Sequence, residues 1–204
     1  ANWVVSDCYF DVASKYMIHI QNVARPDSGD QVVSGNTFIV AGSWSLDAQV
    51  RQESAGGTKY SDNKFYAATA DRCIDVAVAD GVNTSILLLS NNSFEKFRTS
   101  AVRITQAGPS FTGTFLKSVI NGNQFTVRSS GPAIDIDGRY VNSAGIRMVN
   151  ISGNQMDGRK SDGNAFINVS MARNVLIAAN QFTTGTTGVT INRSQDVRVD
   201  PSNQ

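Results

Sequence analysis

The stretch Val119-Ile-Asn-Gly-Asn-Gln-Phe125 decides how this chain folds, because the sequence repeats it with small changes. Val32-Val-Ser-Gly-Asn-Thr-Phe38 and Leu88-Leu-Ser-Asn-Asn-Ser-Phe94 are near copies. The copies close on the large residues Phe10, Phe38, Phe65, Phe94, Phe125, Met156 and Phe182. These residues recur about every 29 positions, a spacing typical of solenoids, in which each repeat is one structural unit.

Each repeat consists of short alternating apolar and polar segments separated by Gly, Asn and Asp, with little helical periodicity. Leucine-rich repeats have a similar length, but their regular leucine spacing is absent. Three short strands and three turns fit one repeat. The sequence therefore predicts an all-β fold, a parallel β-helix of about seven coils with three short strands per coil. We expect residues 1–204 to form a single domain and to be a piece of a longer chain, because the chain starts at Ala1 almost inside a copy.

A second motif keeps step with the first and defines one strand of every coil. In Ala133-Ile-Asp-Ile-Asp137 the isoleucines are expected to face inward and Asp135 and Asp137 outward. The same pattern recurs at Tyr16–Ile20, Asp47–Val50 (the poorest match), Cys73–Val76, Ala101–Ile104, Phe166–Val169 and Gly188–Ile191. Because two independent motifs recur with the same period, the repeat is not explained by chance.

The repeated asparagines and phenylalanines have structural explanations. Asparagine readily accepts the left-handed backbone conformation of a tight turn. Stacked asparagines can also pass amide hydrogen bonds from coil to coil. The phenylalanine that follows each turn is expected to form an interior aromatic column. The asparagines concerned are Asn36, Asn63, Asn92, Asn123, Asn154 and Asn180.

Composition limits the function. The formal charge is +1 with acidic and basic residues interleaved, which predicts neither nucleic acid nor a membrane as a partner. No apolar run approaches the roughly 20 residues that span a bilayer. Cys8 and Cys73 lie two coils apart, too far for a disulfide at about 4.8 Å per coil, and leave the cellular compartment open.

The Ile/Val-x-Gly-Asn-x-Phe turns, as in Val33–Phe38 and Ile120–Phe125, resemble those of the right-handed parallel β-helix superfamily of pectin lyases, polygalacturonases and bacteriophage tailspikes. The resemblance extends from Val4 to Val199 and implies a right-handed helix. Abundant Ser, Thr, Asn and Gly make the tailspike branch the most similar. That resemblance implies a homotrimer that binds, and usually cleaves, bacterial surface polysaccharide (capsule or O-antigen), and a location in a virion tail or outside the cell.

Stacking the second motif predicts two columns of outward side chains. The first contains His19, Gln49, Asp75, Arg103, Asp135, Asn168 and Thr190. The second contains Ala77, Thr105, Asp137, Ser170 and Asn192. Paired carboxylates are what glycosidic cleavage requires, so Asp75, Asp135 and Asp137 are the candidate catalytic residues. Arg103 between them is a candidate to bind substrate. The alternative is a cross-strand Asp–Arg–Asp charge ladder without catalysis.

Other candidates are weaker. His19, the only histidine, is a candidate to bind substrate but cannot build a catalytic triad or a histidine metal site, and we predict no metal and no cofactor. Trp44, Phe111 and Tyr140 lie in or near long loops and could stack on sugar rings or pack against another subunit. Glu53, Asp80 and Glu95 are expected to be ordinary solvated charges.

Three functions fit these observations: a tailspike-type depolymerase, a non-catalytic shaft or receptor-binding segment of a spike, and a secreted polysaccharide lyase or glycoside hydrolase. The sequence does not choose between hydrolysis and elimination.

Overall fold

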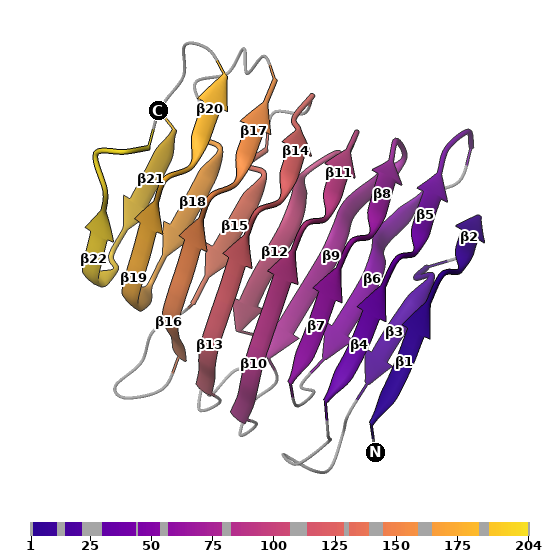
Figure 1. The fold of residues 1–204 in the computed structure, drawn as a ribbon, viewed down its shortest axis with the longest axis horizontal. Coiled ribbons are helices and arrows are strands. Elements are labelled where there is room, and N and C mark those ends of the chain that lie inside the picture. The colour runs from indigo at the N-terminus through magenta and orange to yellow at the C-terminus, as the bar shows by residue number, and fades with distance from the viewer. Residues whose placement is uncertain are drawn as a thin grey trace.

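The computed structural model is a parallel β-helix, as the repeat predicts (Figure 1). It describes residues 2–11, 15–21, 30–43, 45–53, 57–78, 83–106, 114–128, 131–138, 145–158, 165–183 and 188–203. Three parallel sheets run along the molecule, and within the described residues they contain eight, seven and seven strands. No helix occurs in this part of the chain, and accordingly none that is long and apolar enough to cross a membrane.

We call the three sheets A, B and C in the order in which each coil visits them. Sheet A contains β1 (Trp3–Ser6), β4 (Gln31–Ser34), β7 (Thr58–Ser61), β10 (Asn83–Ser90), β13 (Thr114–Asn121), β16 (Gly145–Ser152), β19 (Ala172–Ala178) and β22 (Gln195–Val199). Sheet B contains β2 (Tyr9–Asp11), β5 (Thr37–Val40), β8 (Lys64–Ala67), β11 (Ser93–Glu95), β14 (Gln124–Thr126), β17 (Gln155–Asp157) and β20 (Gln181–Thr183). Sheet C contains β3 (Ile18–Gln21), β6 (Leu46–Glu53), β9 (Ala70–Val78), β12 (Ser100–Gln106), β15 (Ile134–Asp137), β18 (Ile167–Ser170) and β21 (Val189–Asn192).

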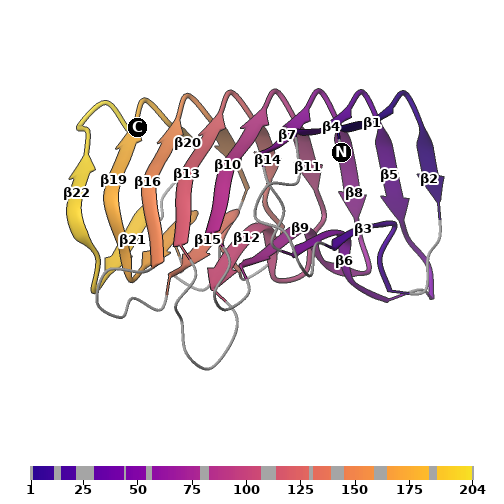
Figure 2. The same cartoon turned by 90° about the horizontal axis from the view of Figure 1, so that it is seen from below.

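The asparagine turns join sheet A to sheet B and form a row of tight bends along one edge of the molecule (Figure 2). From Asn63 onward, each asparagine carboxamide oxygen accepts two hydrogen bonds from the asparagine one coil earlier, whereas Asn36 accepts one, from the backbone N–H of Cys8. Asn92, for example, donates to Asn123 Oδ1 from its backbone N–H and from Nδ2, both at 2.9 Å. This asparagine ladder confirms the predicted stacking, and it extends one coil further than the six predicted members, to Asn203.

The left-handed residue of each turn is not the asparagine, contrary to the prediction. It is the preceding residue, which is glycine in three turns, such as Gly122 with φ of +66°, and aspartate, asparagine or alanine in others, such as Ala179 with φ of +53°. The asparagine itself is buried, and its side chain is committed to the ladder. Asparagine is therefore required for its carboxamide rather than for its backbone conformation.

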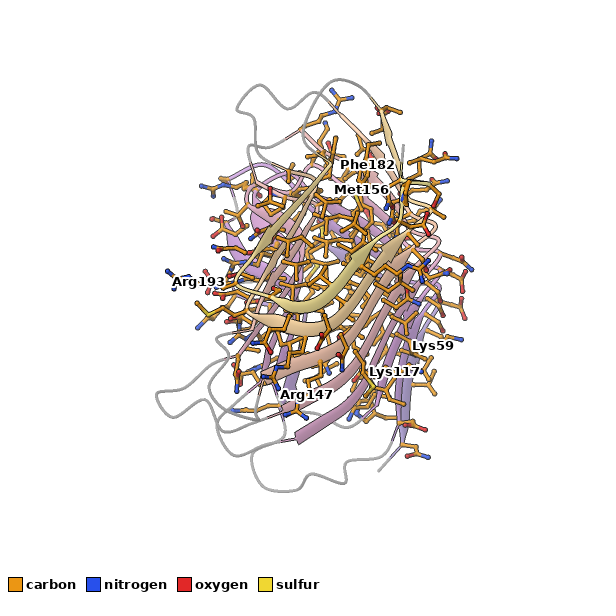
Figure 3. The ribbon with its side chains drawn as sticks, turned by 90° about the vertical axis from the view of Figure 1, so that its left-hand side faces the viewer. Lys59, Lys117, Arg147, Met156, Phe182 and Arg193 are labelled. Atoms are coloured by element: carbon orange, nitrogen blue, oxygen red, sulfur yellow. The ribbon has the colours of Figure 1, made fainter. Side chains whose placement is uncertain are left out.

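The predicted aromatic column is present inside the coil. Phe10, Phe38, Phe65, Phe94 and Phe125 stack in sequence, with ring centroids 4.7–5.0 Å apart. Met156 and Phe182 continue the same position in sheet B, inside the coil (Figure 3). Columns of isoleucine and valine from sheets A and C complete the core. Cys73 belongs to this core, whereas Cys8 is exposed, and both are free thiols, as predicted.

Candidate functional site

The outer face of sheet C carries the predicted column of polar side chains. Arg103 pairs in register with Asp75 on one side and with Asp135 on the other. Asp135 in turn pairs with Asn168, and Asn168 with Thr190. The second column, from Ala77 through Thr105 and Asp137 to Ser170 and Asn192, also has the predicted register.

One member of the first column is wrong. His19 pairs with Arg51, not with Gln49, and Arg51 pairs with Asp75. Gln49 is fully buried and donates from Nε2 to the backbone oxygen of Tyr66 at 3.0 Å. The prediction placed β6 two residues out of register, a shift that preserves the alternation of inward and outward positions and therefore escapes detection by alternation alone.

The correct register places a polar residue, Gln52, inside the coil. Its carboxamide is satisfied there, because Nε2 donates to Thr58 Oγ1 at 3.0 Å and Oε1 accepts from the Tyr60 hydroxyl at 2.9 Å. Buried polar groups with partners are tolerated, whereas unpaired ones are costly. This buried pair of contacts explains why β6 matches the apolar pattern poorly.

The N-terminal half of the column is a charge network. Arg51 donates to Asp75 through a short contact and to Glu53 Oε1 at 3.1 Å, and His19 Nε2 lies 3.3 Å from Glu53 Oε2. Arg72 Nη1 lies 3.8 Å from the same oxygen of Asp75, Oδ2. The Asp75 side chain is only 4% exposed. Both predicted residues of this half are thus held by neighbouring side chains, His19 by Glu53 and Asp75 by two arginines.

These contacts shift the pKa values of two side chains, Glu53 and Arg51. Burial favours the neutral form of Glu53, but hydrogen bonds from Arg51 and His19 outweigh it and lower the pKa of this carboxyl. Burial likewise opposes the charge on Arg51, yet the carboxylates of Asp75 and Glu53 raise the pKa of its guanidinium. Glu53 is therefore an ion-paired member of the face and not the solvated charge predicted from the sequence.

The C-terminal half of the column is more open. Asp135 is 25% exposed, and its Oδ2 lies 4.0 Å from Arg103 Nε. Its other oxygen, Oδ1, accepts from Asn168 Nδ2 at 2.8 Å. A surface pocket of about 320 Å³ opens here and is lined by Pro132, Asp135, Ala165, Asn168 and Thr190. Asp135 is thus the predicted catalytic residue that borders a pocket.

Asp137 lies two residues further along β15 on the same outer face and is half-buried. Within the described part of the chain, its carboxylate has no hydrogen bond or ion pair, and Asp75 Oδ1 and Arg103 Nε are buried without a hydrogen-bond partner. Polar atoms without a hydrogen-bond partner are uncommon in the interior of a protein, and their presence in one patch favours a ligand-binding role for it. Strand geometry separates the Asp135 and Asp137 backbones by roughly 6.6 Å.

The three predicted aromatic contacts, Trp44, Phe111 and Tyr140, lie outside the described residues, as does Asp80. Glu95 is exposed on sheet B, away from this face. Sequence reasoning missed Arg51 and Arg72, which hold Asp75. It also missed a group of cations at the corner between sheets B and C, namely Lys96, Arg98 and Arg128.

Chemistry at the face depends on carboxylates and arginines. Among the described residues, no three His, Cys, Asp or Glu side chains gather in a way that could hold a metal ion. An aspartate that borders a pocket, with a second aspartate on the same strand and an arginine beside it, can bind sugar hydroxyls and exchange protons with them. Comparison with protein-family models, with curated proteins and with solved structures finds no match for this chain.

Proposed function

We propose that this protein binds and cleaves bacterial surface polysaccharide in the manner of the tailspikes that its sequence resembles. The observation that carries the proposal is the pocket of about 320 Å³ on sheet C, bordered by Asp135, Asn168 and Thr190. Parallel β-helices expose long, polar, regular faces, and a chain-like ligand can contact several coils of such a face at once.

In this proposal Asp135 and Asp137 form the acid and base pair. Their backbones lie roughly 6.6 Å apart along the strand and their side chains share one face, a placement compatible with the wider carboxylate spacing of inverting glycosidases, in which a water molecule attacks between the two acids. Arg103, beside Asp135, would hold a substrate oxygen or carboxylate. Asp75 is ion-paired and largely buried, so its contribution would be to position Arg51 and Arg72.

The test is cleavage of purified capsule or O-antigen by Asp135→Asn and Asp137→Asn variants. Each variant removes one ionisable oxygen without changing side-chain size, and we expect at least about a hundredfold loss of cleavage with binding retained. Asp11→Asn is the matched control, because Asp11 is exposed at the end of β2 on another sheet. Unchanged cleavage in both site variants would remove this pair from the mechanism. Binding without cleavage by the unmodified protein would favour the non-catalytic receptor-binding function.

We further propose that the protein assembles as a homotrimer through sheet A. Several large apolar side chains are exposed on its outer face, among them Val4, Ile86, Leu88, Met148 and Leu176. Exposed apolar surface of this kind is typical of protein interfaces. Light scattering should give three times the chain mass, and Leu88→Asp should reduce it, whereas Gln124→Asp on sheet B should not. A monomer at all concentrations contradicts this assembly.

A further inference from the structure

A second pocket lies at the corner where the chain passes from sheet B to sheet C. Its volume is about 430 Å³, and it is lined by Ala68, Lys96, Phe97, Arg98 and Arg128. These residues belong to three consecutive coils, because they follow β8, β11 and β14. The pocket is thus built by the stacking of coils and not by a single loop.

The lining of this corner pocket is cationic. Its described lining residues include three basic side chains and no carboxylate. Arg98 is the one with an acidic neighbour, since its Nε lies 3.6 Å from Asp71 Oδ1. Among the described residues, neither Lys96 nor Arg128 forms an ion pair. The formal charge of the whole chain is only +1, so this is a local concentration of charge.

The three cations and the apolar floor suit an anionic group carried by a ring that packs against Phe97. Phe97 is buried beneath the pocket and gives it an apolar floor. Lys96 Nζ donates to the Tyr66 hydroxyl at 2.7 Å and lies 4.9 Å from the centre of that ring, and these contacts fix the position of the ammonium group. Arg98 is steadied by Asp71 and by Ser45, whose Oγ accepts from Nη1 at 3.3 Å. Guanidinium groups bind carboxylates and sulfates through paired hydrogen bonds.

The corner pocket and the Asp135 pocket lie along the same edge of the molecule. Arg128 and Pro132 are in the same connection, between β14 and β15, and Ala165 is in the next one, before β18. At about 4.8 Å per coil, the centres of the two pockets are roughly two coils, or about 10 Å, apart. One extended glycan running along the helix axis could occupy both.

We propose that the corner pocket binds the negatively charged substituent of an acidic polysaccharide and so makes the protein select charged over neutral glycan. The chemistry required is a carboxylate or a sulfate on a sugar ring. The inference rests on the proposed polysaccharide-binding function, but it concerns residues outside the Asp135 pocket and can fail or succeed separately.

The experiment measures binding to two charged polymers and their neutral counterparts: alginate with its methyl ester, and dextran sulfate with dextran. The variant is Lys96→Gln/Arg128→Gln, which removes the two cations that lack an ion pair. The matched control is Lys117→Gln/Arg193→Gln, the same change of one lysine and one arginine. Both control side chains are exposed, and they extend from opposite sides of the coil (Figure 3).

The unmodified protein should bind at least one charged polymer about tenfold or more tightly than its neutral counterpart. The pocket variant should lose that preference while the control keeps it, and added salt should weaken binding less in the pocket variant. The polymer that is preferred identifies the substituent as carboxylate or sulfate.

Three results would overturn the inference: equal binding of charged and neutral polymers, equal loss in the control variant, or no binding of either charged polymer by the unmodified protein. The cleavage assay separates this outcome from the proposed function. Cleavage of a neutral glycan that depends on Asp135 would leave the function standing and the corner pocket unsupported. Binding of a charged glycan that needs Lys96 and Arg128, without any cleavage, would support the corner pocket and contradict the proposed cleavage.

Discussion

Replacing Asn123 by alanine tests the asparagine ladder at its centre. The Asn123 side chain is 1% exposed and takes part in five hydrogen bonds. Its Oδ1 accepts from the backbone N–H and the side chain of Asn92, and its Nδ2 donates to Leu89, Asn121 and Asn154. Alanine removes all five, and leaves the Asn92 N–H buried without the acceptor it has in the folded coil.

The expected loss in the free energy of unfolding follows from these contacts. A buried donor left without a partner costs about 1–3 kcal/mol, and each further lost hydrogen bond costs about 0.5–1.5 kcal/mol where its partner keeps other contacts. Since Asn92 Nδ2 and Asn154 Oδ1 do keep other partners, one orphaned donor and four further bonds sum to about 3–9 kcal/mol. Bonds that share one carboxamide are not additive, so we expect the lower half of this range, about 3–6 kcal/mol. For a chain of this size that corresponds to a fall in melting temperature of roughly 6–24 °C.

The measurement is urea unfolding and thermal melting of Asn123→Ala beside Asn121→Ala. Asn121 is an ideal control because it precedes the same turn, is exposed, and makes one long hydrogen bond, from Nδ2 to Ser152 Oγ at 3.4 Å. Its replacement should change the free energy of unfolding by less than about 0.5 kcal/mol. If both variants unfold alike, the ladder contributes nothing to stability, and the asparagine repeat needs another explanation.

Three further outcomes are expected. Phe94→Ala should cost about 3–5 kcal/mol in urea unfolding, because the ring is fully buried between two others. A thiol reagent should label Cys8 in the folded protein and Cys73 only on unfolding, since burial raises the pKa of the Cys73 thiol. Burial opposes ionisation of Glu53, but Arg51 lowers the pKa of this carboxyl, so its stabilising contribution is full above the ordinary pKa of 4.5 and is lost as the pH falls. The stability difference between Glu53→Gln and the unmodified protein should therefore be clear at neutral pH and shrink in acid.

The interior of the coil was predictable because it repeats. The turn from sheet A to sheet B uses a carboxamide that bonds to the carboxamide of the next coil, as Asn123 does. Two positions after it, the chain places a large apolar side chain inside the coil, as at Phe125. The recurrence of this Asn-x-Phe pattern therefore indicates the fold. The alternation around Asp135 predicted which side chains face outward for the same reason. Burial and hydrogen bonding require the same residue types at the same positions of every coil, so the sequence repeats those residue types.

The exact neighbours on the outer face were less predictable, because turn lengths vary. The chain takes thirteen positions from Phe38 to Arg51 but ten from Phe125 to Asp135, so spacing alone could not locate the partner of His19. Alternation did not help, since a shift of two residues preserves it. The missing signal was the buried Gln52, whose partners become visible only when the strands are stacked.

The difference between Asp75 and Asp135 could not be foreseen for a related reason. Both are aspartates in the same column beside Arg103, and alternation treats them alike. Their environments differ because Asp75 has Arg51 and Arg72 within reach, whereas Asp135 has Asn168, an uncharged neighbour, on its far side. A carboxylate that neutralises two guanidinium groups is held in place by them, and one that accepts a single amide hydrogen bond at a pocket can still exchange partners with a ligand. Position in the column therefore does not decide how open an acid is: Asp75 is held by two guanidinium groups, whereas Asp135 has one arginine at 4.0 Å and one amide donor and stays the more exposed of the two.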